Sequence, residues 1–158
     1  MSANFETTIR RLWAGLRLPA PTFRDKPEVT LSIDGTDLKL AETADGRGLA
    51  VSGRLGRLSA DPGERDGQTR RLLQIGLGLM ASNCSWVGPD PDDPAGAAIL
   101  AEARFDYADG RGDRLIGVIE NVIQAVEILS PELSARSRRE PDHRGGTGGL
   151  EEAMIFRP

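Results

Sequence analysis

The stretch EVTLSIDGTDLKLAETADGRGLAVSGRL, residues 28–55, decides the fold. It contains three runs in which apolar and polar residues alternate, the period of a strand with one buried face. Asp-Gly pairs at 34–35 and 45–46 separate the runs, and such pairs are typical of hairpin turns. The runs cover residues 28–34, 36–43 and 47–55. We therefore expect three sequential strands that form an antiparallel meander.

A helical pattern precedes this meander. Residues 3–18 carry apolar side chains at the spacing of one helix face, and Pro19 and Pro21 end the pattern. The apolar positions are Phe5, Ile9, Leu12, Trp13 and Leu16. This segment is expected to be an amphipathic helix that packs on the sheet.

Further elements follow the meander. Residues 59–67 are expected to be a loop, and residues 68–82 a second helix that is apolar around much of its circumference. Such a helix should be buried within the chain or against another subunit. Two more strands are expected at 84–87 and 97–107, separated by the loop PDPDDPAG at 89–96. In the second of these strands one face is apolar, with Ile99, Ala101, Ala103 and Phe105.

The last expected helix covers residues 113–133, with Asp113 as its N-cap candidate. The fold class is therefore α+β in the order α-β-β-β-α-β-β-α, with helices flanking a twisted antiparallel sheet. At 158 residues the chain suits one domain, which we assign to residues 1–133. Residues 134–158 are polar and rich in Arg and Gly, which favours a disordered tail with a short apolar end, EEAMIFRP.

Composition limits the classes of function. The net charge is -4 and aromatic residues make up only 4% of the chain, so binding to nucleic acid is disfavoured. The single cysteine, Cys84, cannot form an internal disulfide, which favours a reducing compartment. No apolar run is long enough to span a membrane, and the N-terminus does not resemble a signal peptide. These features predict a cytoplasmic protein that does not insert into membranes.

No constellation of residues predicts catalysis, a metal or a cofactor. The motif Gly76-x-Gly78 lacks the preceding strand that a dinucleotide-binding turn requires, and His143 lies in the expected tail. The acidic loop at 90–93 does not match the spacing of a calcium site. We therefore expect a binding protein rather than an enzyme. Trp13 and Trp86 are either core residues or part of a protein-binding patch, where Trp is enriched.

The order of elements resembles the class I chaperones of bacterial type III secretion, the Tir-chaperone family. The resemblance covers residues 3–133. It is carried by four pieces: TTIRRLWAGLRLP, LSIDGTDLKL, RRLLQIGLGLMASN, and the unit ILAEARFDY followed by RGDRLIGVIENVIQAVEIL. The loop at 89–96 and the C-terminal tail depart from the family pattern.

This resemblance implies a cytoplasmic, ATP-independent homodimer. Such a chaperone binds the N-terminal segment of a secreted effector in extended form and keeps it competent for export, and the secretion ATPase is a further partner to consider. The resemblance places the dimer interface on the second helix and the following strand, at Leu72, Ile75, Gly76, Leu79 and Trp86. It places effector side chains in apolar grooves near the first helix and the sheet, at Leu12, Trp13, Leu16, Ile33 and Leu40.

Two other classes of function stay open at this stage. One is a protein-binding adaptor of the same fold that takes no part in secretion. The other is a small-ligand-binding domain or enzyme, which would need polar groups that converge in a pocket.

Overall fold

A computed structural model describes residues 2–23, 26–83, 85–109 and 112–134. The predictions for Cys84, for His143 and for the tail at 135–158 lie outside these residues. The element order is α-β-β-β-α-β-β-α, as expected, with a short 3-10 turn (η1, Tyr107–Asp109) before the last helix. Within the described part of the chain, no helix is long and apolar enough to cross a membrane.

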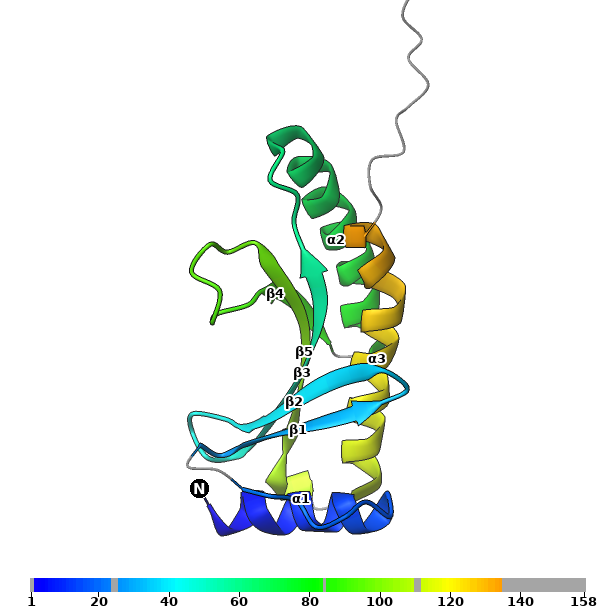
Figure 1. Ribbon diagram of the computed structural model, residues 1–158. Coiled ribbons are helices and arrows are strands. Elements are labelled where there is room, and N and C mark those ends of the chain that lie inside the picture. The colour runs from blue at the N-terminus through cyan, green and yellow to red at the C-terminus, as the bar shows by residue number, and fades with distance from the viewer. Residues whose placement is uncertain (1, 24–25, 84, 110–111, 135–158) are drawn as a thin grey trace, which may run out of the picture.

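Five strands form one antiparallel sheet in the order β1-β2-β3-β5-β4 (Figure 1). Their bounds are β1 Glu28–Ile33, β2 Thr36–Glu42, β3 Gly48–Arg57, β4 Trp86–Pro89 and β5 Ala98–Asp106. The Asp-Gly turn at 34–35 joins β1 to β2, and both of its residues have positive φ, 49° and 82°. The predicted meander is therefore correct, and β1 and β4 are left as the two edges of the sheet.

Helix α3 (Gly112–Ser134) packs along one face of this sheet, and none of the described residues forms a helix on the opposite face (Figure 1). The covered face supplies Leu38, Leu40, Leu49 and Val51, none of which is exposed to solvent. The helix contributes six buried residues: Leu115, Ile119, Val122, Ala125, Val126 and Leu129. The alternation seen in the sequence therefore marks the inner face of the sheet correctly.

Helix α1 (Ala3–Gly15) lies across one end of the sheet (Figure 1). Ser2 caps it, since the Phe5 N–H donates to Ser2 Oγ at 3.2 Å. The helix ends three residues earlier than the sequence predicted. Arg17 adopts a positive φ of 56°, and the Leu18 N–H donates to the Trp13 carbonyl at 2.9 Å. Pro19 disfavours the helical conformation for Leu18, which explains the early end.

Helix α2 (Pro62–Asn83) begins six residues before the predicted start at residue 68, so the expectation of a loop at 59–67 was wrong for most of that segment. Asp61 caps the helix, because its Oδ1 accepts from the Glu64 N–H at 2.9 Å. Pro62 occupies the first helical position, where its missing N–H costs nothing. The Asp-Pro pair is a helix start signal that the neighbouring glycines obscured.

Smaller differences concern the ends of other elements. Strand β4 begins at Trp86 rather than at residue 84, and α3 begins at Gly112, which places Asp113 in the first turn and not at the N-cap. Strand β3 continues to Arg57 through a bulge between Arg54 and Gly56. Gly56 has a φ of 150°, which glycine adopts without strain.

Gly53 lets α3 approach β3 closely. A Cβ at this position would lie 2.8 Å from Val126 Cγ2 and 3.2 Å from Val122 Cγ1, which is closer than packed carbons come. Because valine side chains on a helix are stiff, we expect Gly53→Ala to lower the free energy of unfolding by about 1–3 kcal/mol. Urea unfolding followed by circular dichroism would measure this loss.

The matched control is Gly117→Ala in α3. A Cβ there would meet nothing within 4 Å. Alanine favours a helix over glycine by up to about 1 kcal/mol, so this variant should be as stable as the wild type or slightly more stable. Equal stability of Gly53→Ala and the wild type would contradict the close packing of α3 on β3.

Candidate functional site

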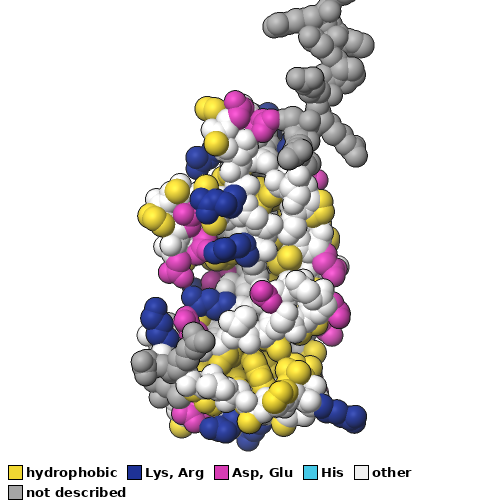
Figure 2. All heavy atoms as spheres, in the orientation of Figure 1, with side chains coloured by type: hydrophobic (Ala, Val, Ile, Leu, Met, Phe, Trp, Pro, Cys, Tyr) yellow, Lys and Arg dark blue, Asp and Glu magenta, His cyan; other side chains and the backbone are white. Residues whose placement is uncertain are grey.

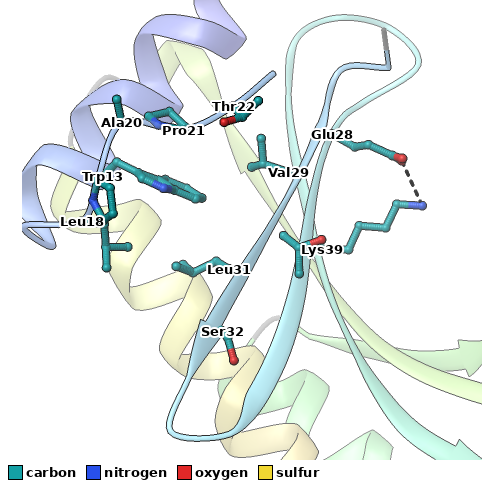
Figure 3. Close-up of a pocket in the computed structure, with 12 residues that line it drawn as sticks. Trp13, Leu18, Ala20, Pro21, Thr22, Glu28, Val29, Leu31, Ser32 and Lys39 are labelled. Atoms are coloured by element: carbon teal, nitrogen blue, oxygen red, sulfur yellow. Dashed lines mark ion pairs between the residues drawn. The ribbon is translucent and has the colours of Figure 1, made fainter. Parts of the chain in front are cut away.

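A groove of about 780 Å³ separates the edge strand β1 from the chain that follows α1. We call it the β1 groove. Trp13, Leu18 and Pro21 line one side, and Val29 and Leu31 of β1 line the other. Figure 3 shows these side chains pointing toward one another across the opening. In Figure 2 hydrophobic side chains gather in a hollow just above α1. The groove therefore offers apolar contacts from both walls.

The β1 wall also carries unpaired backbone groups. In a hairpin with a two-residue turn, the pair flanking the turn, here Ile33 and Thr36, exchanges hydrogen bonds, and every second pair does so after it. By this alternation the N–H and C=O groups of Thr30 and Ser32 point away from β2 and toward the groove. No backbone hydrogen bond joins these two residues to segment 18–22 among the residues that the structure describes.

The opposite wall makes no backbone hydrogen bond to β1 among the described residues. Segment 18–22 contains Pro19 and Pro21, which have no N–H to donate. The segment is anchored beyond its end, where the Phe23 ring lies 6.1 Å from the Phe5 ring and 5.3 Å from the Arg10 guanidinium carbon. Segment 18–22 therefore stands apart from β1 across the groove, and the edge of the strand stays available for pairing.

Charged side chains lie at the Glu28 end of the groove. Lys39 Nζ is 3.2 Å from Glu28 Oε2 and 3.3 Å from Asp92 Oδ2. The hydrogen bonds that Lys39 donates, first to Glu28 and then to Asp92, raise the pKa of Lys39 despite partial desolvation, so the ammonium stays charged. Lys39 thereby connects the groove to the loop between β4 and β5.

A second apolar surface lies on α2. Leu73, Leu77 and Met80 are 60%, 68% and 51% exposed, and their spacing places them on one face of the helix. We call them the α2 stripe. An apolar cavity of about 430 Å³ between α2 and β4 adjoins this stripe, with Leu72 and Val87 in its walls. Exposed side chains of this size, gathered on one face, are typical of a protein-binding surface.

The five residues predicted to contact an effector have different positions. Trp13 lines the β1 groove although it is only 8% exposed. Leu12 and Leu40 are buried in the core, and Ile33 is partly buried against it. Leu16 is 37% exposed but lies outside the groove lining. The sequence prediction omitted Leu18, Val29 and Leu31, although the prolines after α1 could have indicated a wall there.

The residues predicted for the dimer interface lie mainly inside the chain. Leu72 and Leu79 are buried in the core, Gly76 is buried, and Ile75 is partly buried. Trp86 lies on the open face of the sheet, where its Nε1–H donates to Glu102 Oε1 at 3.3 Å. Burial of α2 within the chain is confirmed for this inner face, and the α2 stripe, which the interface prediction did not include, is exposed in the single chain.

The titratable groups in the β1 groove are Glu28 and Lys39, which form an ion pair, and the α2 stripe is apolar. The described residues contain no group of three or more His, Cys, Asp and Glu side chains that could hold a metal ion. The Tyr107 hydroxyl is buried, and burial together with the Glu42 carboxylate raises its pKa, so it stays protonated. The geometry of the described residues therefore suits binding to another protein.

Comparison with solved structures identifies the fold. A chain of the HopA1–SchA chaperone–effector complex superposes with a TM-score of 0.65, at 15% sequence identity over 80% of this chain and 93% of that chain. A chain of the complex between the Yersinia pestis type III secretion chaperone SycH and a fragment of YscM2 gives 0.59, at 18% identity over 79% and 98%.

A chain of the ExoU–SpcU complex from the type III secretion system of Pseudomonas aeruginosa gives a TM-score of 0.62, at 19% identity over 79% of this chain and 97% of that chain. No protein family model matches the sequence, and no curated protein sequence matches it either. The chain has the fold of the class I type III secretion chaperones, as the sequence resemblance implied.

Proposed function

We propose that this protein is a type III secretion chaperone that binds one extended segment of a secreted effector. The observation that carries the proposal is the β1 groove, in which apolar side chains face the free edge of a strand. An extended client can donate and accept main-chain hydrogen bonds at Thr30 and Ser32 while its alternate side chains enter the groove. The chaperone fold supports the assignment of this client to a secretion system.

The finer parts of the proposal concern the client and the energy source. The client segment is the N-terminal region of the effector, which the chaperone holds unfolded in the bacterial cytoplasm until export. Binding by apolar contacts and strand pairing needs no ATP, so the export apparatus supplies the energy. The protein acts as a carrier and not as an enzyme.

We further propose that the protein is a homodimer through the α2 stripe. Three large apolar side chains that are more than half exposed favour association, and a helix face can pair with its own copy across a twofold axis. The α2–β4 cavity beside the stripe provides a recess for side chains of the second copy. The partly buried Ile75 and the buried Leu72 and Leu79 support the stripe from within the chain.

The first test uses two leucines that are equally exposed. Leu18 and Leu16 are 38% and 37% exposed, but only Leu18 lines the β1 groove. The tagged protein would be purified from its native host and its partners identified by mass spectrometry. We expect Leu18→Asp to recover at least about tenfold less effector, because the carboxylate would be desolvated without a partner.

Leu16→Asp should recover as much effector as the wild type. If Leu16→Asp alone loses the effector, the contact surface predicted from the sequence is correct and the β1 groove is not the site. A dominant partner that is not a secreted protein would favour an adaptor in place of a chaperone.

The second test concerns strand pairing. Thr30→Pro removes the N–H that faces the groove without removing a hydrogen bond to β2, and an edge strand tolerates proline. We expect the affinity for the effector segment to fall about fivefold to tenfold, since one main-chain hydrogen bond and the close approach of the client are lost. Isothermal titration calorimetry would measure this change.

Thr30→Val serves as the control, because it removes the hydroxyl and keeps the N–H. Its affinity should equal that of the wild type. Equal affinity of Thr30→Pro would show that the client does not pair with β1.

The third test concerns the dimer. Leu77→Glu places a charge at the centre of the α2 stripe, where the side chain is 68% exposed and packing within the chain is not disturbed. We expect monomers at micromolar concentration, because dimerisation would bury an unpaired carboxylate. Light scattering would give the mass. Gln74→Glu adds the same charge at an exposed position of α2 outside the stripe, and it should leave a dimer. A dimer in both variants would place the interface elsewhere.

A further inference from the structure

A third cavity lies on the open face of the sheet, beneath the loop between β4 and β5. Its volume is about 320 Å³. Thr30, Ala41, Ala50 and Ser52 contribute small side chains to its lining, and Asp37 and Glu102 contribute carboxylates, of which Glu102 contacts Trp86 and Arg104. Lys39 of β2 and Arg54 of β3 stand beside the loop residues Asp90 and Asp92. In Figure 2 basic and acidic side chains alternate along the left side of the molecule, from which the loop projects in Figure 1.

The loop places its acidic residues against the basic residues of the sheet. Arg54 Nη2 lies 3.2 Å from Asp90 Oδ2, and Lys39 Nζ lies 3.3 Å from Asp92 Oδ2. Arg57 makes a third pair of this kind with Asp93, also at 3.2 Å. The loop therefore neutralises cations that would otherwise line an open cavity.

Two of these acidic residues hold the loop in shape. Asp93 Oδ2 accepts from the N–H groups of Ala97 and Ala98 at 3.1 and 2.7 Å, and these bonds hold the pKa of Asp93 below its usual range. Asp90 Oδ1 accepts from the Asp92 N–H at 2.9 Å. The Asp92 carboxylate makes no such bond within the described part of the chain, and it is 77% exposed. Among the described residues the Asp92 carboxylate contacts only Lys39, so it can move away from Lys39 without unfolding the loop.

This cavity lies next to the β1 groove. Both are lined by Thr30 and Lys39, and the Lys39 ammonium lies 3.2 Å from Glu28 at the end of the groove. A client on β1 meets Lys39 beside Thr30, and Arg54 lies farther across the sheet and two residues nearer the Asp34–Gly35 turn. The cations in this region are Lys39 and Arg54, and their present partners are the carboxylates of Asp92 and Asp90.

We propose that the open face of the sheet is a second subsite for the same extended client, and that it binds acidic residues flanking the apolar strand. In the free protein the Asp92 carboxylate pairs with the Lys39 ammonium, and in the complex a carboxylate of the client replaces Asp92 in this ion pair. The inference rests on the proposed function, because the client must first occupy the β1 groove. It adds a rule of selection: an apolar strand flanked by Asp or Glu is preferred over one with a neutral flank.

The test uses fluorescent peptides with one apolar core, Val-Thr-Val-Thr-Val, flanked at either end by three Glu or three Gln residues. Because the direction of the client strand is open, each flank is made at both ends. We expect one Glu peptide to bind wild-type protein about fivefold more tightly than its Gln counterpart, the effect of roughly one ion pair. Fluorescence anisotropy measures the affinities, and the preference should vanish at high salt.

Variants of the chaperone complete the test. Arg54→Gln should remove the preference for Glu, whereas Arg104→Gln should keep it. The two arginines are similarly exposed, at 71% and 74%, and only Arg54 lines the cavity. Asp92→Asn should tighten binding of the Glu peptide and leave the Gln peptide unchanged. Asp66→Asn on α2, which alters the net charge equally, should change neither.

The outcomes separate this inference from the proposed function. If Glu and Gln peptides bind wild-type protein equally, and Leu18→Asp weakens both, then the β1 groove is correct and the acidic subsite is wrong. If no peptide binds, strand pairing at the β1 groove is itself wrong and the subsite falls with it. A preference for Glu that survives Arg54→Gln would also overturn the subsite.

Discussion

The packing of α3 on one face of the sheet is the constraint on which the other features depend. Most buried apolar side chains of β1, β2, β3 and β5 lie on the side that α3 covers, and Leu100 on the other side lies in the cavity beneath the loop between β4 and β5. Gly53 brings Val122 and Val126 close to β3, so the helix lies flat on the sheet. Since one helix suffices to cover this face, the opposite face stays in contact with solvent. The available binding surfaces follow from this asymmetry.

The β1 groove results from the way the chain enters the sheet. Helix α1 packs across the end of the sheet, and the chain must then return to begin β1. Pro19 and Pro21 remove two N–H donors from the returning segment, and among the described residues no backbone hydrogen bond joins segment 18–22 to Thr30 or Ser32. The segment therefore stands apart from β1 while Phe23 fixes its far end. An unprotected strand edge usually leads to aggregation, and this wall limits access to an extended chain that fits the groove.

Helix α2 has one apolar face in the core and a second apolar face exposed to solvent. Its inner residues Leu72 and Leu79 complete the core, while Leu73, Leu77 and Met80 face outward. Exposure of the outward apolar face to water costs free energy, and a binding partner that covers this face removes the cost. The open face of the sheet behaves differently, because its charged residues are already paired with the loop between β4 and β5. The two surfaces therefore suit different partners, a second copy on α2 and an exchangeable acidic chain on the sheet.

The sequence by itself determined the element order, the meander and the inner faces of the strands and of α1 and α3, because periods of two and of 3.6 residues report directly which side of an element is buried. It also indicated the chaperone fold, which the solved structures support. It did not locate the start of α2, since the cap at Asp61 lies among glycines that favour a loop.

Only the tertiary structure decided which of two apolar stripes on α2 faces the core, because both have helical spacing and the choice depends on where β4 and α3 lie. The same holds for the groove residues. Leu12 and Leu40 carry the same pattern as Val29 and Leu31 and all four are buried, but the path of the chain after α1 leaves only Val29 and Leu31 in the lining of an opening. Local periodicity fixes a face, whereas exposure of that face depends on contacts between elements that are distant in sequence.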